Sequence, residues 1–262
     1  MPPLEGLVYG LRILQSLLGI AALVRLYCTG LHRHFRILFW FLTFNVLQSL
    51  VLLATDWFPR PRSAYAWTWV LSEPFMWLFY VLLGLNVYSL VLQDYKGLQT
   101  VGRWIFLTAV PLSIGASALT VLPAWNKPHG NAFLFYYTTI DRGVMFSLVI
   151  FILVTLLLLS LYPIKLSRNI VMHAVVCTIF LISASMGYFI RNAGKDSPSL
   201  YHAVDFAHQV ITVLCWSAWL LLLSPKGEET GMILHKWTPE QEERLVSQLT
   251  AINSSLMRAT RK

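Results

Sequence analysis

Seven long apolar stretches, separated by short polar connections, make up most of this 262-residue chain. Because an α-helix rises about 1.5 Å per residue, roughly 20 apolar residues cross the hydrocarbon of a bilayer. Lipid offers backbone groups no hydrogen-bond partner, so segments that span it must be helical. The pattern therefore predicts an all-α, polytopic membrane protein built as a bundle of seven transmembrane helices. The cores of the predicted spans are 7–26, 37–55, 67–92, 104–122, 143–162, 169–190 and 206–224.

The sequence becomes polar after residue 224, which predicts two regions. Residues 1–225 form the transmembrane domain, and residues 226–262 form a cytoplasmic tail. Thr238, followed by a proline and then by Gln241, is typical of a helix start with a capping box.

Apolar residues in the tail then recur at steps of four, three and four, which predicts an amphipathic helix over 238–260 with one apolar face. We expect this face to lie on the headgroups or the bundle ends, to pair with a second copy, or to bind a cytoplasmic protein. The residues of the predicted partner-binding face are Leu245, Leu249, Ile252 and Leu256.

Composition and charge agree with a membrane protein and set its orientation. The chain is 56% hydrophobic and 12% charged, whereas soluble domains carry about 25% charged residues. The net charge of +8 comes mostly from the first, third and fifth connections and from the tail. Because basic loops stay on the cytoplasmic side, we expect the N-terminus outside and the C-terminus in the cytoplasm, with no nucleic-acid partner.

Five charged or titratable side chains, within the spans or at their ends, lie in the half that this orientation places outside: Arg12, Glu73, Asp141, Asp205 and His208. An ionised group at mid-membrane costs about 2.5–3.5 kcal/mol even on lenient insertion scales, so it has to be paired, hydrated or near the surface. Arg12 needs an acidic partner, which we expect to be Glu73 or Asp141, with Asp205 as a third candidate. Together the five residues are the predicted ligand-binding site.

Three classes of function fit this arrangement. In the first, a sensor or receptor-like protein binds a small polar ligand, or senses pH, in an outward-facing polar pocket. In the second, a small-solute or ion transporter, or a metal-dependent membrane hydrolase, uses the same pocket. In the third, a non-catalytic scaffold uses the charges only to fasten its helices together. An enzyme is the less favoured interpretation, and no catalytic residue, metal ligand or cofactor is assigned.

The sequence does not supply the residues that two kinds of cofactor, haem and retinal, would need. A haem held by two histidines would need His173 and His208, which differ in depth by about 15–20 Å at 1.5 Å per residue. A retinal photoreceptor needs a lysine in the middle of the seventh helix, and that span contains none.

Four stretches resemble a group of uncharacterised bacterial multi-span membrane proteins: Asn45–Leu52, Tyr88–Leu98, Tyr162–Asn169 and Gln248–Lys262. The resemblance covers most of the chain and implies a location in the bacterial inner membrane. The group has no assigned activity, so the resemblance implies no catalytic residue.

Overall fold

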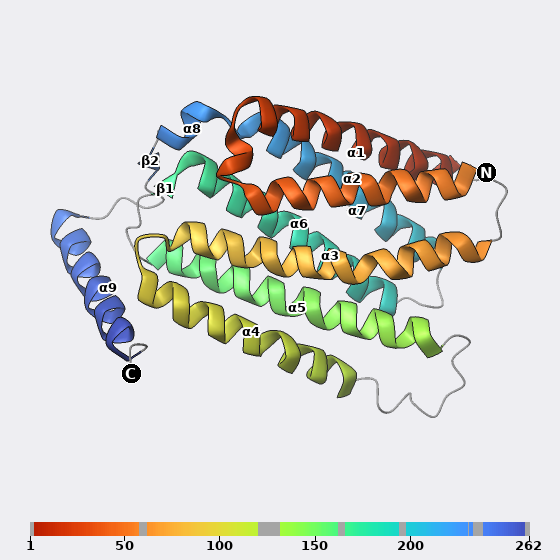
Figure 1. The fold of residues 1–262 in the computed structure, drawn as a ribbon. Helices are drawn as coiled ribbons and strands as arrows, with labels where there is room; N and C mark the ends of the chain where they lie inside the picture. The colour runs from red at the N-terminus through yellow and green to blue at the C-terminus, as the bar shows by residue number, and fades with distance from the viewer. Residues whose placement is uncertain are drawn as a thin grey trace. The chain divides into compact units, whose positions relative to one another are not determined.

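The computed structural model describes residues 3–57, 62–119, 132–161, 166–193, 198–229, 231–232 and 238–259, and this part of the chain is almost entirely helical (Figure 1). The helices are α1 (Pro3–Cys28), α2 (Arg36–Trp57), α3 (Arg62–Val91), α4 (Lys96–Leu119), α5 (Ala132–Leu161), α6 (Arg168–Ala193), α7 (Pro198–Leu222), α8 (Pro225–Glu229) and α9 (Pro239–Ala259). A short 3₁₀ helix, η1 (Leu31–Arg33), precedes α2, and β1 (Leu166–Ser167) pairs antiparallel with β2 (Gly231–Met232). Each of the helices α1 to α7 covers all or most of one predicted span, and residues 120–122 and 162 of the predicted spans lie outside the described residues.

Five of the described helices carry segments that are long and apolar enough to cross a membrane: Gly6–Cys28, Arg36–Thr55, Trp67–Val91, Arg168–Gly187 and His202–Leu222. The surfaces of these segments are apolar as well, since Leu17, Leu71 and Leu214 are 59, 65 and 62% exposed. A soluble monomer rarely leaves large contiguous apolar surface in water. The protein is therefore membrane-embedded. In α5 the described apolar segment is shorter, Gly143–Thr155.

The chain packs into two compact units, and α3 and α6 contribute residues to both. Unit 1 comprises Met1–Leu83 and Val175–Pro225, and so contains α1, α2 and α7 with parts of α3 and α6. Unit 2 comprises Gly84–Ala174 and Lys226–Lys262, and so contains α4, α5, α8 and α9 with the remaining parts of α3 and α6.

An aromatic cluster forms much of the core of unit 1. Phe180 of α6 lies 5.9 Å from the ring of Phe41 on α2, 5.9 Å from Tyr80 on α3 and 6.1 Å from Trp219 on α7, measured between ring centroids. These separations are typical of aromatic rings packed edge to face or tilted, each pair adding about 0.5–1.5 kcal/mol beyond area burial. The cluster therefore joins four helices of unit 1 through direct ring contacts.

Close helix packing in unit 1 depends on Gly19 of α1. A Cβ atom built on Gly19 would overlap the ring of Trp216 on α7 and lie 2.6 Å from Cγ2 of Val46 on α2. Trp216 is completely buried, so its ring has no free volume to move into. The absence of a side chain at Gly19 is what lets the three helices meet.

Unit 2 is organised around the antiparallel neighbours α4 and α5. Phe106 of α4 and Phe151 of α5 have ring centroids 4.1 Å apart, and the Ser113 hydroxyl donates a hydrogen bond to the carbonyl of Gly143 at 3.0 Å. A Cβ on Gly143 would lie 2.8 Å from the backbone of Ile114. The two backbones approach closely because position 143 is a glycine.

The C-terminal helix α9 occupies the place of the predicted tail helix and packs against the start of α4. The Asn253 side-chain oxygen accepts hydrogen bonds from the backbone N–H groups of Gly97, at 2.7 Å, and Leu98, at 3.4 Å. The first N–H groups of a helix have no partner within it, so Asn253 caps α4 from another helix. At its own start α9 has the expected capping contact, because the Thr238 N–H donates to Gln241 Oε1 at 3.3 Å.

The predicted apolar face of α9 is divided by this contact. Leu249 is 3% exposed, Leu245 and Leu256 are partly exposed, and Ile252 is 41% exposed. The face turned toward α4 is centred on Leu249 and Asn253, so it is rotated away from Ile252. The role of the four residues in binding a partner stays a prediction.

Candidate functional site

Polar side chains from five helices meet pairwise inside unit 1, and we call this set the polar belt. Its members are Arg12 and Gln15 of α1, Asn45 and Gln48 of α2, Ser72 and Glu73 of α3, Ser183 of α6, and Asp205 and His208 of α7. Each contact joins one helix to the next, in the order α3, α2, α1, α7, α6.

The only ion pair among the described residues joins α1 to α7. The Arg12 Nη2 atom lies 3.8 Å from Asp205 Oδ2, and the two side chains are 39% and 17% exposed. The partner that the structure gives Arg12 is therefore the third candidate and not Glu73, whereas the alternative partner Asp141 has its side chain outside the described residues. Asp205 sits on the helix that packs directly against α1, whereas Glu73 is turned toward α2. A separation of 3.8 Å is an electrostatic contact without a hydrogen bond.

Glu73 is the most deeply buried charged residue of the belt, at 6% exposure. The Gln48 amide donates to the Ser72 hydroxyl oxygen at 2.8 Å and to Glu73 Oε2 at 3.4 Å. An amide that supplies its hydrogens to a buried carboxyl group offsets part of the cost of removing that group from water. Gln48 therefore fixes Glu73 on the α2 side of α3.

Two further contacts complete the belt. The Gln15 amide donates to Asn45 Oδ1 at 3.3 Å, between α1 and α2. His208 Nδ1 lies 3.3 Å from the Ser183 hydroxyl oxygen, between α7 and α6. The Ser183 hydroxyl also donates to the Phe180 carbonyl of its own helix at 2.8 Å.

All belt residues lie at similar depth in unit 1. Counted along each helix at 1.5 Å per residue, they stand about 10–18 Å from the beginning of α1, α3 and α7 and from the end of α2 and α6. These helix ends lie on the right-hand side of Figure 1. The charged groups are thus about two to three turns inside their helices, within the depth of a hydrocarbon layer.

One polar group beside the belt has no hydrogen-bond partner in the part of the chain that the structure describes. The side-chain oxygen of Gln209, the residue after His208, is buried and accepts no hydrogen bond among the described residues. A buried acceptor left unsatisfied costs about 1–3 kcal/mol. A water molecule or a ligand that donates to Gln209 Oε1 would remove this cost.

Of the five predicted site residues, Arg12, Asp205 and His208 fall within one connected set, since Asp205 and His208 are one turn apart on α7 and Arg12 contacts Asp205. Glu73 belongs to the same belt through α2. Asp141 lies on α5 in unit 2, and its side chain lies outside the described residues.

The predicted site left out five members of the belt: Gln15, Asn45, Gln48, Ser72 and Ser183. A signal was present, because three pairs of polar residues stand three positions apart in otherwise apolar spans: Arg12 and Gln15, Asn45 and Gln48, Asp205 and His208. Residues three apart share a helix face, so each pair indicates a polar strip facing other helices.

No group of three or more His, Cys, Asp or Glu side chains close enough to hold a metal ion occurs among the described residues. Asp205 and His208 alone supply two potential ligands, whereas structural and catalytic zinc sites use three or four.

The fold and the belt define an all-helical, membrane-embedded protein with charged residues inside its helix core. No protein-family model matches the chain, and neither a curated protein nor a solved structure matches it. The arrangement of the polar belt is therefore the basis for assigning a function.

Proposed function

We propose that the protein is a multi-pass membrane protein of sensor or receptor-like organisation, which binds a small polar ligand at the polar belt of unit 1. The single observation that carries the proposal is the partly exposed Arg12–Asp205 pair, 3.8 Å apart, two to three turns inside apolar helices. Charged residues in membrane spans are costly and most often serve a function. A purely structural pair would gain from closer, hydrogen-bonded contact.

The chemistry around this pair suits a small polar molecule. A ligand acceptor atom could bond to the Arg12 guanidinium, and a ligand donor could bond to the Asp205 carboxylate or to Gln209 Oε1. His208 stands one turn from Asp205 on α7, and a change in pH is the second stimulus that we propose for this site. Binding at such a site shifts a conformational equilibrium only if one state of the bundle binds more tightly.

The wider arrangement belongs to the same proposal. The protein lies in the inner membrane of a bacterial cell and crosses it seven times, with α4 and α5 added to the five apolar segments. The N-terminus is then outside the cell membrane, and α9 is in the cytoplasm. The basic residues in the α1–α2 connection and in the tail support this orientation, because basic segments stay on the cytoplasmic side. On α9, Ile252 is exposed at 41% and Val246 at 37%, which supports a role of this helix in contacting a second copy or a cytoplasmic protein.

Thiol labelling from outside the cell tests whether the site contains water. In a Cys28→Ser background, Gln209→Cys places a thiol beside the belt without changing the charged residues. We expect a membrane-impermeant methanethiosulfonate reagent, applied to intact cells, to modify it, because such reagents react with hydrated thiolates. Cys177 and Cys215 are buried and should not react.

Leu214→Cys is the matched control for this experiment. Leu214 is on the same helix and is 62% exposed, but it faces the lipid, where the reagent does not enter. A Gln209→Cys protein that stays unmodified from both sides of the membrane would contradict the proposal. That result would favour a non-catalytic scaffold, in which the charges only fasten the helices together. The observation that supports a scaffold is that the belt residues contact one another in pairs between neighbouring helices.

A further inference from the structure

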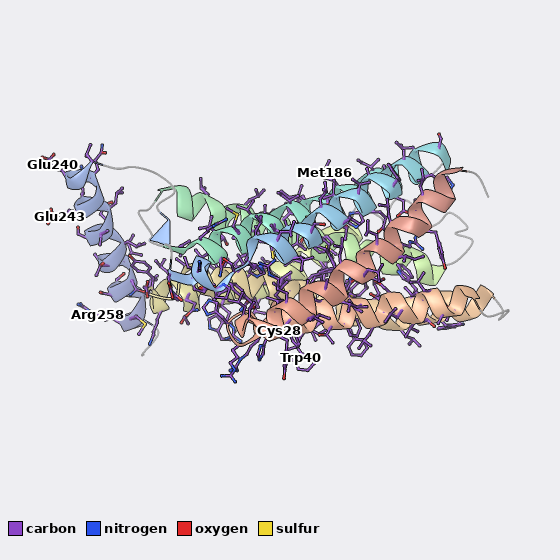
Figure 2. All side chains as sticks on the ribbon, turned by 90° about the horizontal axis from the view of Figure 1, so that it is seen from above. Cys28, Trp40, Met186, Glu240, Glu243 and Arg258 are labelled. Atoms are coloured by element: carbon purple, nitrogen blue, oxygen red, sulfur yellow. The ribbon has the colours of Figure 1, made fainter. Side chains whose placement is uncertain are left out.

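The connection between α1 and α2 gathers basic and aromatic side chains at one end of unit 1. Arg33, His34 and Arg36 are exposed there, and the flanking rings of Tyr27 and Trp40 are 65% and 59% exposed. The labels of Cys28 and Trp40 mark this turn in Figure 2. The sequence from position 6 to position 55 contains no Asp or Glu. No carboxylate of α1, η1 or α2 in that stretch therefore neutralises the basic side chains.

The backbone holds these side chains outward. Gly30 has a φ of +74°, a left-handed conformation that ends α1 and that residues with a side chain rarely adopt. The two apolar residues of the turn, Leu31 and Phe35, are 5% and 0% exposed, and the Phe35 N–H donates to the Leu31 carbonyl at 2.9 Å. With Leu31 and Phe35 fixed in the core, Arg33 and His34 project away from it, whereas His32 is partly buried against Tyr27.

The turn lies where the apolar surface of two spans ends. Val24 on α1 and Leu47 on α2 are 57% and 56% exposed and so face hydrocarbon. Tyr and Trp rings favour the headgroup level, and Tyr27 is held there by stacking on His32, with ring centroids 5.1 Å apart. The cationic groups beyond these rings therefore meet the layer in which lipid phosphates lie.

We propose that the α1–α2 turn is a binding surface for an anionic phospholipid, whose phosphate lies between Arg33 and Arg36 while Tyr27 and Trp40 flank its glycerol region. Charge complementarity selects the anionic class. A zwitterionic headgroup brings its own ammonium group, and α1, η1 and α2 offer it no carboxylate between positions 6 and 55. A phosphatidylglycerol headgroup carries a negative phosphate and no ammonium group, so its charge complements that of Arg33 and Arg36.

Native mass spectrometry of the full chain in detergent tests this proposal. The measured quantity is the ratio of the affinities for the first bound phosphatidylglycerol and the first bound phosphatidylcholine with the same acyl chains. Each basic residue near an anionic headgroup favours binding about fivefold. We therefore expect the double variant Arg33→Gln/Arg36→Gln to lower the ratio about 25-fold, and Arg33→Lys/Arg36→Lys to keep most of it. Both arginines are exposed, so the variants should fold normally.

The control is Arg244→Gln/Arg258→Gln, which removes the same charge from exposed positions on α9 and should leave the ratio unchanged. The proposal is overturned if the glutamine variant keeps the wild-type ratio, or if the lysine or α9 variants lose as much as it does. Competition with soluble glycerol phosphate distinguishes a lipid surface from a site for free phosphates. Displacement of the bound lipid by this compound at millimolar concentration would show a site for free phosphates rather than a lipid surface, and would overturn the proposal too.

Discussion

Alanine at position 19 is expected to destabilise unit 1 by about 1–3 kcal/mol, the usual cost of extra atoms in a filled core. The added methyl group would overlap the Trp216 ring and approach Val46 Cγ2 to 2.6 Å. Trp216 is fully buried and Val46 is 5% exposed, so neither side chain can move without displacing a helix. The gain in helix propensity on replacing glycine, about 0.5–1 kcal/mol, offsets only part of the cost.

Gly10→Ala provides the matched control, because a Cβ at Gly10 of the same helix meets no atom within 4 Å. Thermal unfolding of the purified full chain in one detergent, followed by near-UV circular dichroism, measures both variants. Gly19→Ala should melt at a lower temperature than the wild type, whereas Gly10→Ala should melt at the same or a slightly higher temperature. Equal melting temperatures for the two variants would contradict the close packing of α1 against α2 and α7.

Alanine at position 97 is expected to release α9 from α4. A Cβ on Gly97 would lie 2.6 Å from the backbone carbonyl oxygen of Asn253, and backbone can move away only if the helix moves. That movement would break the hydrogen bond from the Gly97 N–H to Asn253 Oδ1, now 2.7 Å long. Loss of a helix cap costs about 0.5–2 kcal/mol, so the protection of the α9 amides against exchange should fall by about two- to thirtyfold.

Hydrogen–deuterium exchange of α9 in the full chain measures this release. Gly115→Ala is the control, since a Cβ at Gly115 of the same helix meets nothing within 4 Å, and its α9 should exchange like the wild type. Asn253→Ala removes the cap without adding an atom at position 97 and should also speed exchange. If α9 exchanges at the wild-type rate in both Gly97→Ala and Asn253→Ala, the docking of α9 through Asn253 is wrong.

The positions of the helices could be predicted from the sequence because the bilayer imposes a length and an apolar composition on any span. Residues 7–26 and 37–55 were expected in spans, and α1 and α2 contain them. The start of α9 was also predictable, since the capping pattern depends on neighbours within one turn, and Thr238 and Gln241 make the expected contact.

The partners of the buried polar residues were less predictable. Depth along a helix places Arg12, Glu73 and Asp205 at one level, but depth does not reveal which face of a helix meets which neighbour. Arg12 pairs with Asp205 because α1 packs against α7, a fact of tertiary packing that spacing within one span cannot encode.

The capping of α4 by Asn253 was hidden for a similar reason. Asn253 is a polar residue four positions after Leu249, and hydrophobic periodicity assigns no role to it. The Asn253 side-chain oxygen is needed because the first N–H groups of α4 have no partner within their own helix. The Gly97 N–H group that it accepts from lies 156 residues earlier in the chain. Contacts of such large sequence separation depend on how the helices assemble.

The central claim is that the polar belt binds a ligand, and a high-resolution cryo-EM map of the full chain in lipid nanodiscs tests it most directly. We expect ordered water or ligand density in contact with Arg12, Asp205 and Gln209 Oε1, in a cavity that opens to the face from which Gln209→Cys is labelled. A dry layer, in which Arg12 is closely paired and protein side chains fill the space around Gln209, would contradict the claim. The charges would then serve only to hold the helices together.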